Sequence, residues 1–224
     1  ISILAFSSKV RAAEDLYDVP KVTTVQNRLY HLHNELTLQG SYLPLDPFVK
    51  YFGVGGSYTM HFSSFTAWEI LNGTYIFAVP SQLKKDVNFF GYPPSNTEKA
   101  GKPFDDQFFT MKYMVSTNLK FTPLYIKNLF FNSKIVYSMI SFVGGGGVAQ
   151  FERDDKKQTR MRPFINLGVV IHYMLSESAL IKFDFRDQIF TAADTKNQLA
   201  LTLGFAVNFG GKSAKEEREI EEEF

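Results

Sequence analysis

The segment from Asn197 to Phe209 alternates large apolar residues with small or uncharged polar residues at every position. A period of two over the whole segment predicts a β-strand and leaves no helical alternative. A soluble sheet would offer charged side chains to water on its polar face, whereas this face is small and uncharged, as in a crowded barrel interior. The pattern therefore predicts that the apolar face points outward into lipid.

The same alternation recurs in seven segments upstream, over residues 35–42, 54–63, 68–77, 113–121, 135–143, 165–173 and 181–186. Both faces of 135–143 are apolar, so its orientation stays open. With the last segment there are eight strands, an even number, as expected for a bacterial outer-membrane barrel. We therefore predict an all-β fold, a transmembrane antiparallel up-and-down β-barrel of about eight strands.

The lengths of the expected connections alternate along the chain. Residues 63–65 and 175–177 form tight links, whereas 43–52, 78–110, 147–159 and 189–196 are longer. Outer-membrane barrels keep short turns in the periplasm and long loops outside the cell. The alternation therefore predicts periplasmic termini, and only the link 122–133 is longer than this rule allows. Within the long loop, Leu83 to Asp86 are expected to form a helical turn before prolines interrupt it.

Composition limits the other possibilities. The formal net charge of +1 gives no field that would recruit nucleic acid, and the chain has no cysteine. No apolar run approaches the roughly 20 residues of a spanning helix. We divide the chain into an N-terminal extension (1–30), an outer-membrane barrel (31–209) and a charged periplasmic tail (210–224); residues 1–13 resemble the end of a signal peptide.

Charged residues on the inward face define the candidate site. Since about eight strands leave room only for side chains, these charges are expected to neutralise one another rather than to line a pore. The predicted lumen ion-pair network comprises Glu35, Glu69, Lys112, Lys120, Lys182, Asp184 and Arg186.

The residues at the alternate positions of each strand, on the face opposite the charged residues, are expected to face lipid. They are Leu36, Leu38, Tyr58, Met60, Phe62, Trp68, Ile165, Leu167, Ile171, Phe183, Phe185, Leu199, Leu201, Leu203 and Phe205.

No motif predicts catalysis or a metal site. The four histidines are His31, His33, His61 and His172, and no carboxylate or cysteine spacing completes a metal site around them. Ser81 and Lys84 match the Ser-x-x-Lys motif of penicillin-recognising enzymes by letters only. The Gly144–Gly147 run lacks the Lys-Ser/Thr of a phosphate-binding loop and is expected at the end of a strand. We expect no catalytic residue, no metal and no cofactor, with bound lipid as the one small-molecule partner.

Several short segments resemble an outer-membrane β-barrel family of predatory bacteria, myxobacteria and their relatives. They are Val25-Gln26-Asn27-Arg28, Tyr42-Leu43-Pro44-Leu45-Asp46, Tyr58-Thr59-Met60-His61-Phe62, Ala67-Trp68-Glu69, Phe121-Thr122-Pro123-Leu124-Tyr125 with Lys127, and Phe131-Asn132. The resemblance extends from Val25 to Phe209. The chain departs from the family pattern at Ile126, where glycine is usual, and in its charged tail.

The resemblance implies an eight-stranded, porin-like barrel without enzymatic activity. It also implies a ring-shaped homo-oligomer, with a pentamer as the expected form, that encloses outer-membrane lipid. The link 122–133 would then be a characteristic periplasmic connection.

Other functions stay open at this point. A small lipid-modifying enzyme would use histidine, serine and a carboxylate near the extracellular rim, and a surface adhesin or receptor would use the long loop 78–110. A soluble ligand-binding barrel is the alternative at the level of the fold, and it would reverse the polarity of the strands.

Overall fold

The computed structural model describes residues 31–90, 109–130, 134–153, 158–176, 178–191 and 197–210. The N-terminal extension (1–30) and the charged tail after Gly210 lie outside the described residues, as do Val25–Arg28 and Phe131-Asn132 of the family resemblance.

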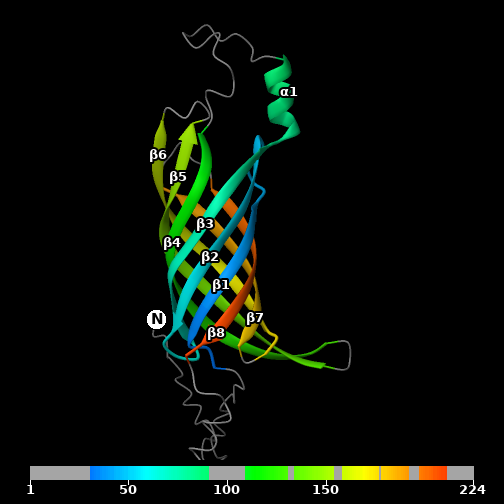
Figure 1. Cartoon of the computed structure of the whole chain (residues 1–224), viewed down its shortest axis with the longest axis vertical. Coiled ribbons are helices and arrows are strands. Elements are labelled where there is room, and N and C mark those ends of the chain that lie inside the picture. Colours follow the sequence, from blue (N-terminus) through cyan, green and yellow to red (C-terminus); the bar gives the residue numbers. More distant parts are fainter. Residues whose placement is uncertain are drawn as a thin grey trace, which may run out of the picture.

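The described chain forms eight antiparallel strands that close into one barrel (Figure 1). Each strand pairs with its neighbours in sequence, and β1 pairs with β8 to close the sheet. This confirms the predicted fold class. The strands are β1 (Asn34–Leu43), β2 (Val49–His61), β3 (Thr66–Pro80), β4 (Phe109–Phe130), β5 (Lys134–Arg153), β6 (Thr159–Met174), β7 (Ala179–Phe190) and β8 (Gln198–Phe209).

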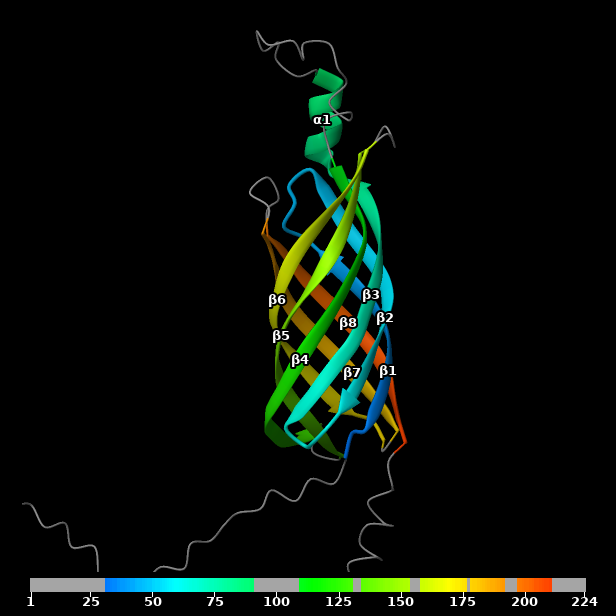
Figure 2. The same ribbon diagram turned by 90° about the vertical axis from the view of Figure 1, so that its left-hand side faces the viewer.

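The two ends of the barrel differ. The β2–β3 and β6–β7 turns and the β4–β5 hairpin lie at one end, together with the start of β1 and the end of β8 (Figure 2). We call this the short-turn end. The longer β1–β2, β3–β4, β5–β6 and β7–β8 connections lie at the other, the long-loop end.

One helix, α1 (Gln82–Phe90), follows β3 at the long-loop end and stands above the barrel in Figure 1. The Ser81 hydroxyl accepts a hydrogen bond from the Lys84 amide (3.3 Å), so Ser81 caps the helix, and it also donates to the Pro47 carbonyl (2.7 Å). The predicted helical turn at Leu83 is therefore confirmed, and Ser81 has a structural role in starting it. In the described residues no helix is long and apolar enough to cross a bilayer.

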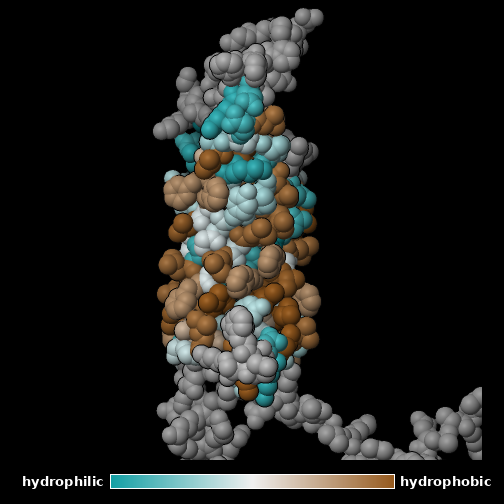
Figure 3. All heavy atoms as spheres, turned by 90° about the vertical axis from the view of Figure 1, so that its right-hand side faces the viewer, coloured by the Kyte–Doolittle hydropathy of each residue, from teal (hydrophilic) through white to brown (hydrophobic). Residues whose placement is uncertain are grey.

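Strands alternate between a buried inward face and an exposed outward face. Along β1, Glu35, Thr37 and Gln39 are buried, whereas Leu36 and Leu38 are 57% and 70% exposed. Apolar residues cover much of the barrel wall in Figure 3, and hydrophilic residues gather toward the long-loop end. The middle of the barrel thus has a polar inside and an apolar outside, as the alternation in the sequence predicts.

The link 122–133 is not a loop, which corrects the sequence-based expectation. β4 continues to Phe130 and β5 begins at Lys134, so the two strands remain paired from Leu124 to Phe130 as a hairpin. β5 stays paired with β6 from Ser138 onward, so only the outer part of the hairpin, residues 127–130 and 134–137, extends beyond the barrel wall. A register shift between Phe121 and Leu124 places Pro123 in a bulge. At this position the backbone is not paired across the sheet, so the absence of an N–H on proline does not cost a hydrogen bond between the strands. The strand therefore bends at this point instead of ending.

Other strands also begin or end outside the predicted limits. β2 begins at Val49 and β6 at Thr159, and β5 continues to Arg153, so the connections 43–52 and 147–159 are shorter than expected. The Gly144–Gly147 run lies in the middle of β5 and not at its end. Alternation in the sequence missed the extensions of β2 and β5 because apolar residues occupy their inward faces near the long-loop end.

Candidate functional site in the barrel interior

The inward residues of β7 show how the interior is layered. From the short-turn end they are Leu180, Lys182, Asp184, Arg186, Gln188 and Phe190, all buried. An apolar residue is therefore followed by three charged residues, a polar amide and an aromatic ring. In the rest of the interior, buried apolar clusters likewise lie at the two ends, and the charged residues of β1, β3 and β4 lie between them.

Glu69 on β3 is the main acceptor of the charged layer. Arg186 donates to both of its carboxylate oxygens, at 2.8 and 3.1 Å, and the Lys120 ammonium lies 2.7 Å from Oε2. The side-chain amides of Asn72 and Asn118 donate to Oε1 at 2.9 and 2.7 Å. Glu69 is fully buried, and this number of donors satisfies its charge.

Glu35 on β1 is the second acceptor. The Lys182 ammonium donates to its Oε1 at 2.6 Å, and the Thr37 hydroxyl donates to the same oxygen at 3.1 Å. Its other oxygen lies 3.3 Å from His61 Nε2 and 3.9 Å from His172 Nε2. Two of the four histidines therefore meet one buried carboxylate.

Arg186 joins the network to a third carboxylate. Its Nε donates to Asp184 Oδ1 at 2.8 Å while its Nη atoms bind Glu69. Three carboxylates, Glu35, Glu69 and Asp184, thus face three cations, Lys120, Lys182 and Arg186, and the six formal charges cancel. Paired charges of this kind can fill a barrel whose centre excludes bulk water.

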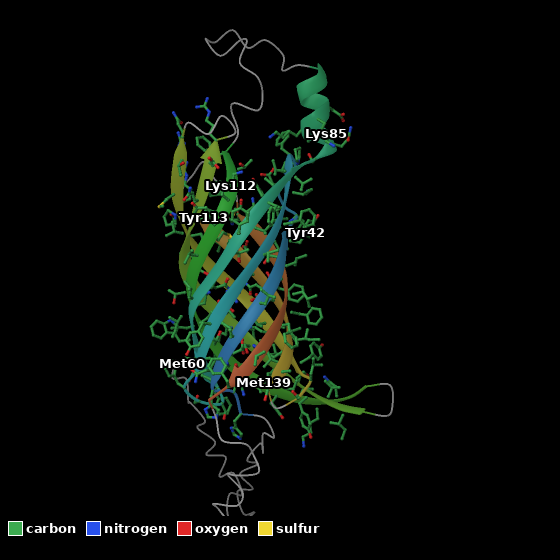
Figure 4. All side chains as sticks on the ribbon, in the orientation of Figure 1. Tyr42, Met60, Lys85, Lys112, Tyr113 and Met139 are labelled. Atoms are coloured by element: carbon green, nitrogen blue, oxygen red, sulfur yellow. The ribbon has the colours of Figure 1, made fainter. Side chains whose placement is uncertain are left out.

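Lys112 does not join this network, which corrects its assignment to the lumen. It lies in a bulge between Met111 and Tyr113, where the register against β5 shifts by one residue. The bulge interrupts the alternation, so the Lys112 side chain is 34% exposed and its ammonium lies 3.9 Å from Glu152 Oε2. Figure 4 shows Lys112 near the long-loop end.

Inward glycines provide the space that the network occupies. A Cβ on Gly145 would lie 2.4 Å from Asn118 Oδ1 and 2.2 Å from the Thr117 carbonyl oxygen, and one on Gly168 would lie 2.9 Å from Arg186 Cγ. Real Cβ atoms do not approach other atoms so closely. The sequence shows these glycines, but their purpose is visible only in the closed barrel.

An apolar cluster fills the interior at the long-loop end. Sequence reasoning missed it because its members come from the ends of many strands, where alternation with polar residues weakens. The buried residues are Leu43, Val49, Tyr51, Ile76, Met111, Met114, Ala149, Phe151, Phe164, Phe190 and Ala200.

A second apolar cluster lies at the short-turn end. Its buried members are Tyr125, Met139, Met174, Leu180 and Ala206. Because Tyr125 belongs to the β4–β5 hairpin and the others come from β5 to β8, the hairpin contributes to closing this end. The charged layer is therefore enclosed between two apolar clusters.

A cavity of about 150 Å³ opens beside this cluster. His31, His33 and His61 line it with hydroxyl and apolar side chains, among them Ser63 and Met139. Within the described part of the chain, no three His, Cys, Asp or Glu side chains are arranged to hold a metal ion. All four histidines lie toward the short-turn end, far from the long loops where the lipid-modifying enzyme was expected to place its site.

The residues expected to face lipid all lie on the outward face. Ten are exposed: Leu36, Leu38, Phe62, Trp68, Ile165, Leu167, Phe183, Phe185, Leu203 and Phe205. The remaining five are partly buried by neighbours on the wall: Tyr58, Met60, Ile171, Leu199 and Leu201. None points into the interior.

One outward polar residue has its hydrogen bonds satisfied on the wall itself. The Thr117 hydroxyl accepts a hydrogen bond from the Trp68 indole N–H at 2.8 Å and donates to the Glu69 carbonyl at 3.1 Å. The pair thus removes both a donor and an acceptor from an otherwise apolar surface.

Neither a protein-family model nor a curated protein sequence matches this chain. Among solved structures, it is similar to the N-terminal β-barrel domain of Pseudomonas aeruginosa OprF, with 11% identity and a TM-score of 0.47 over 80% of this chain and all of that one. It is also similar to Neisserial surface protein A, with 10% identity and a TM-score of 0.45 over 79% of this chain and 97% of that one. A major outer membrane protein from Thermus thermophilus is 11% identical, with a TM-score of 0.40 over 79% of this chain and 99% of that one. Scores this low carry no functional conclusion.

Proposed function

We propose that this chain is a porin-like structural protein of a bacterial outer membrane, with its termini in the periplasm. The observation that carries the proposal is the polarity of the closed barrel. Every strand places at least one large apolar side chain on the outside, 45 to 70% exposed: Leu38, Val54, Leu71, Leu119, Phe142, Leu167, Phe185 and Leu203. A continuous apolar wall of this kind is unfavourable in water and suits a lipid surround.

The interior supports a structural role rather than transport through a single subunit. Two apolar clusters enclose a charged layer in which three carboxylates meet three cations. Moving a hydrated solute through the centre would require breaking these buried ion pairs, which is costly. The functional surface of the molecule is then its outer wall.

We further propose that several copies assemble into a ring that encloses membrane lipid, with five copies as the family resemblance implies. A subunit of such a ring needs an apolar wall both toward the bulk membrane and toward the enclosed lipid. The outward side chains of all eight strands meet this requirement, since each strand contributes an exposed apolar residue.

Extraction in mild detergent followed by native mass spectrometry tests both levels of the proposal. We expect a homo-oligomer that retains phospholipid, and a folded barrel whose gel mobility changes on boiling. A folded monomer without lipid would contradict the ring alone. A protein that stays in solution without detergent would contradict the membrane location as well.

A second candidate, a surface adhesin or receptor, is favoured by one observation: α1 extends the long-loop end above the barrel (Figure 1). Deleting residues 82–108 would then abolish binding to the partner surface and leave heat-modifiable mobility intact. Retained binding would exclude this candidate.

A further inference from the structure

The β4–β5 hairpin leaves the barrel wall at the short-turn end. At its base, residues 138–140 of β5 are still paired with β6, and beyond them the two strands project sideways past β7 (Figures 1 and 4). Tyr125 is 6% exposed in the apolar cluster with Met174 and Leu180. The base of the hairpin therefore still belongs to the barrel, while its outer part extends sideways.

The outer part of the hairpin has apolar and cationic side chains that remain accessible. Leu124 and Ile135 are 48% and 57% exposed, and the exposed Lys127 holds its ammonium 5.5 Å from the Tyr137 ring centroid. Asn128 donates to Ser138 across the two strands at 2.9 Å. A two-stranded ribbon is only marginally stable by itself in water, so it gains stability from a surface to lie on.

The charged residues of the hairpin are all positive. From Thr122 to Phe151 there is no aspartate or glutamate, and the hairpin carries Lys127 and Lys134. Aliphatic, aromatic and lysine residues together are typical of segments at the boundary between lipid chains and headgroups. Lysines near an anionic leaflet are attracted to its phosphates.

We propose that this hairpin is an interfacial anchor that binds the anionic phospholipid headgroups of the leaflet at the short-turn end. The proposal rests on the membrane location argued above. The exposed Leu124 and Ile135 continue the apolar wall of the barrel, and Lys127 provides the charge that complements a phosphate. At the short-turn end Glu35 and Glu69 are buried and already paired. In a second copy of the chain, these two carboxylates would therefore not be available to pair with Lys127. This favours lipid as the binding partner of the hairpin.

The absence of cysteine allows a direct test with the full chain in vesicles. Single cysteines are introduced by Ile135→Cys in the hairpin, by Leu175→Cys in the β6–β7 turn at the same end, and by Leu203→Cys in the middle of the outer wall. The rate of labelling by a water-soluble thiol reagent is compared in pure phosphatidylcholine and in vesicles that also contain phosphatidylglycerol.

We expect position 135 to label more slowly when phosphatidylglycerol is present, whereas position 175 labels equally in both. Each lysine near an anionic surface contributes about a fivefold preference, so Lys127→Gln, which removes one charge, should raise the rate at position 135 by about fivefold in these vesicles. The matched substitution Lys85→Gln on α1, at the opposite end, should leave the rate unchanged.

Other outcomes would overturn the proposal. Equal labelling of position 135 in both lipids would show that headgroups are not the occupant. Protection that depends on the protein-to-lipid ratio would assign the surface to a second copy, and protection lost on deletion of residues 211–224 would assign it to the tail. Rapid labelling of position 203 would instead show that the wall is not in lipid, so failure of the membrane location is distinguishable from failure of the anchor.

Discussion

At the scale of single residues, the interior depends on groups that cannot be removed one at a time. Glu69 is fully buried and accepts hydrogen bonds from Arg186, Asn118 and Asn72 while it pairs with Lys120. Burial makes each member of this set dependent on the others, because a charge left without its partner keeps its full desolvation cost. The partly exposed pair of Lys112 and Glu152 lacks this dependence.

We expect Glu69→Gln to lower the free energy of unfolding by about 3–5 kcal/mol, the typical cost of breaking a buried ion pair. The amide keeps the shape of the side chain but leaves Arg186 and Lys120 without their shared charge. Urea unfolding in detergent micelles measures the change. Glu152→Gln is the matched control, and its effect should be below about 1 kcal/mol since the pair is partly exposed. Equal effects of the two substitutions would show that burial does not matter here.

A second residue-scale prediction concerns glycine. Gly145→Ala should destabilise the barrel by about 1–3 kcal/mol, because the new methyl group would overlap Asn118 and the backbone of β4. Gly144→Ala, one residue away on the outer face, meets its nearest neighbour only at 3.9 Å and should be tolerated. The folded fraction on an unboiled gel compares the two variants. The prediction fails if both alanines fold equally well.

At the scale of elements, alternation between an inward and an outward face identifies the strands of this barrel, but it does not show where each strand begins or ends. β8 alternates over its whole length, whereas β2 and β5 continue into regions where the inward face is also apolar. β4 contains two bulges: one turns Lys112 out of the interior, and the other, at Pro123, lies at the base of the β4–β5 hairpin, where β4 no longer pairs with β3. Bulges thus decide which side chains reach the centre and where the wall ends.

The outward face of β8 gives the prediction at this scale. Leu203→Arg should reduce the stability of the barrel in a bilayer by about 2–4 kcal/mol, because a cation would be placed on the lipid side of the wall. Leu45→Arg in the β1–β2 connection is the control, since Leu45 is similarly exposed, 53% against 55%, but lies outside the strands. Folding yield into vesicles is the measurement. Tolerance of arginine at position 203 would contradict the outward apolar wall.

At the scale of the whole molecule, the barrel is a filled cylinder. An apolar cluster at each end encloses a charged layer whose six formal charges cancel, and the hairpin contributes Tyr125 to the cluster at the short-turn end. Eight strands leave an interior that side chains can fill, so closure and filling occur together. The outer wall and the hairpin are then the surfaces through which this molecule meets its surroundings.

The filled interior predicts the electrical behaviour of the barrel. Purified protein in a planar lipid bilayer should show no stable open channel, in contrast to a 16-stranded porin measured as the positive control. The combined substitution of Phe151 and Phe190 by alanine removes two rings from the apolar cluster at the long-loop end. These rings pack edge to face, with their centroids 5.6 Å apart. This variant should still show no stable channel, because the charged layer remains. Regular conductance from the unmodified chain would contradict the filled interior.

Much of this architecture could be predicted from the sequence, because period-two alternation depends only on which residues follow one another. The number of strands, their antiparallel order and the outward direction of Leu203 and Phe205 all follow from that local pattern. The interior could not be predicted in the same way. Glu69 and Arg186 are 117 positions apart, and nothing between them in the sequence indicates that they form two hydrogen bonds.

The sequence by itself therefore determined the two-sided character of the strands and the charges available to the interior. The tertiary structure alone decided how those charges pair, that Lys112 stays outside the network, and that residues 122–130 form a strand rather than a loop. The physical reason is that closure of the barrel and the β-bulges set the register between strands that are distant in the sequence. A shift of one residue reverses the face on which every following side chain lies.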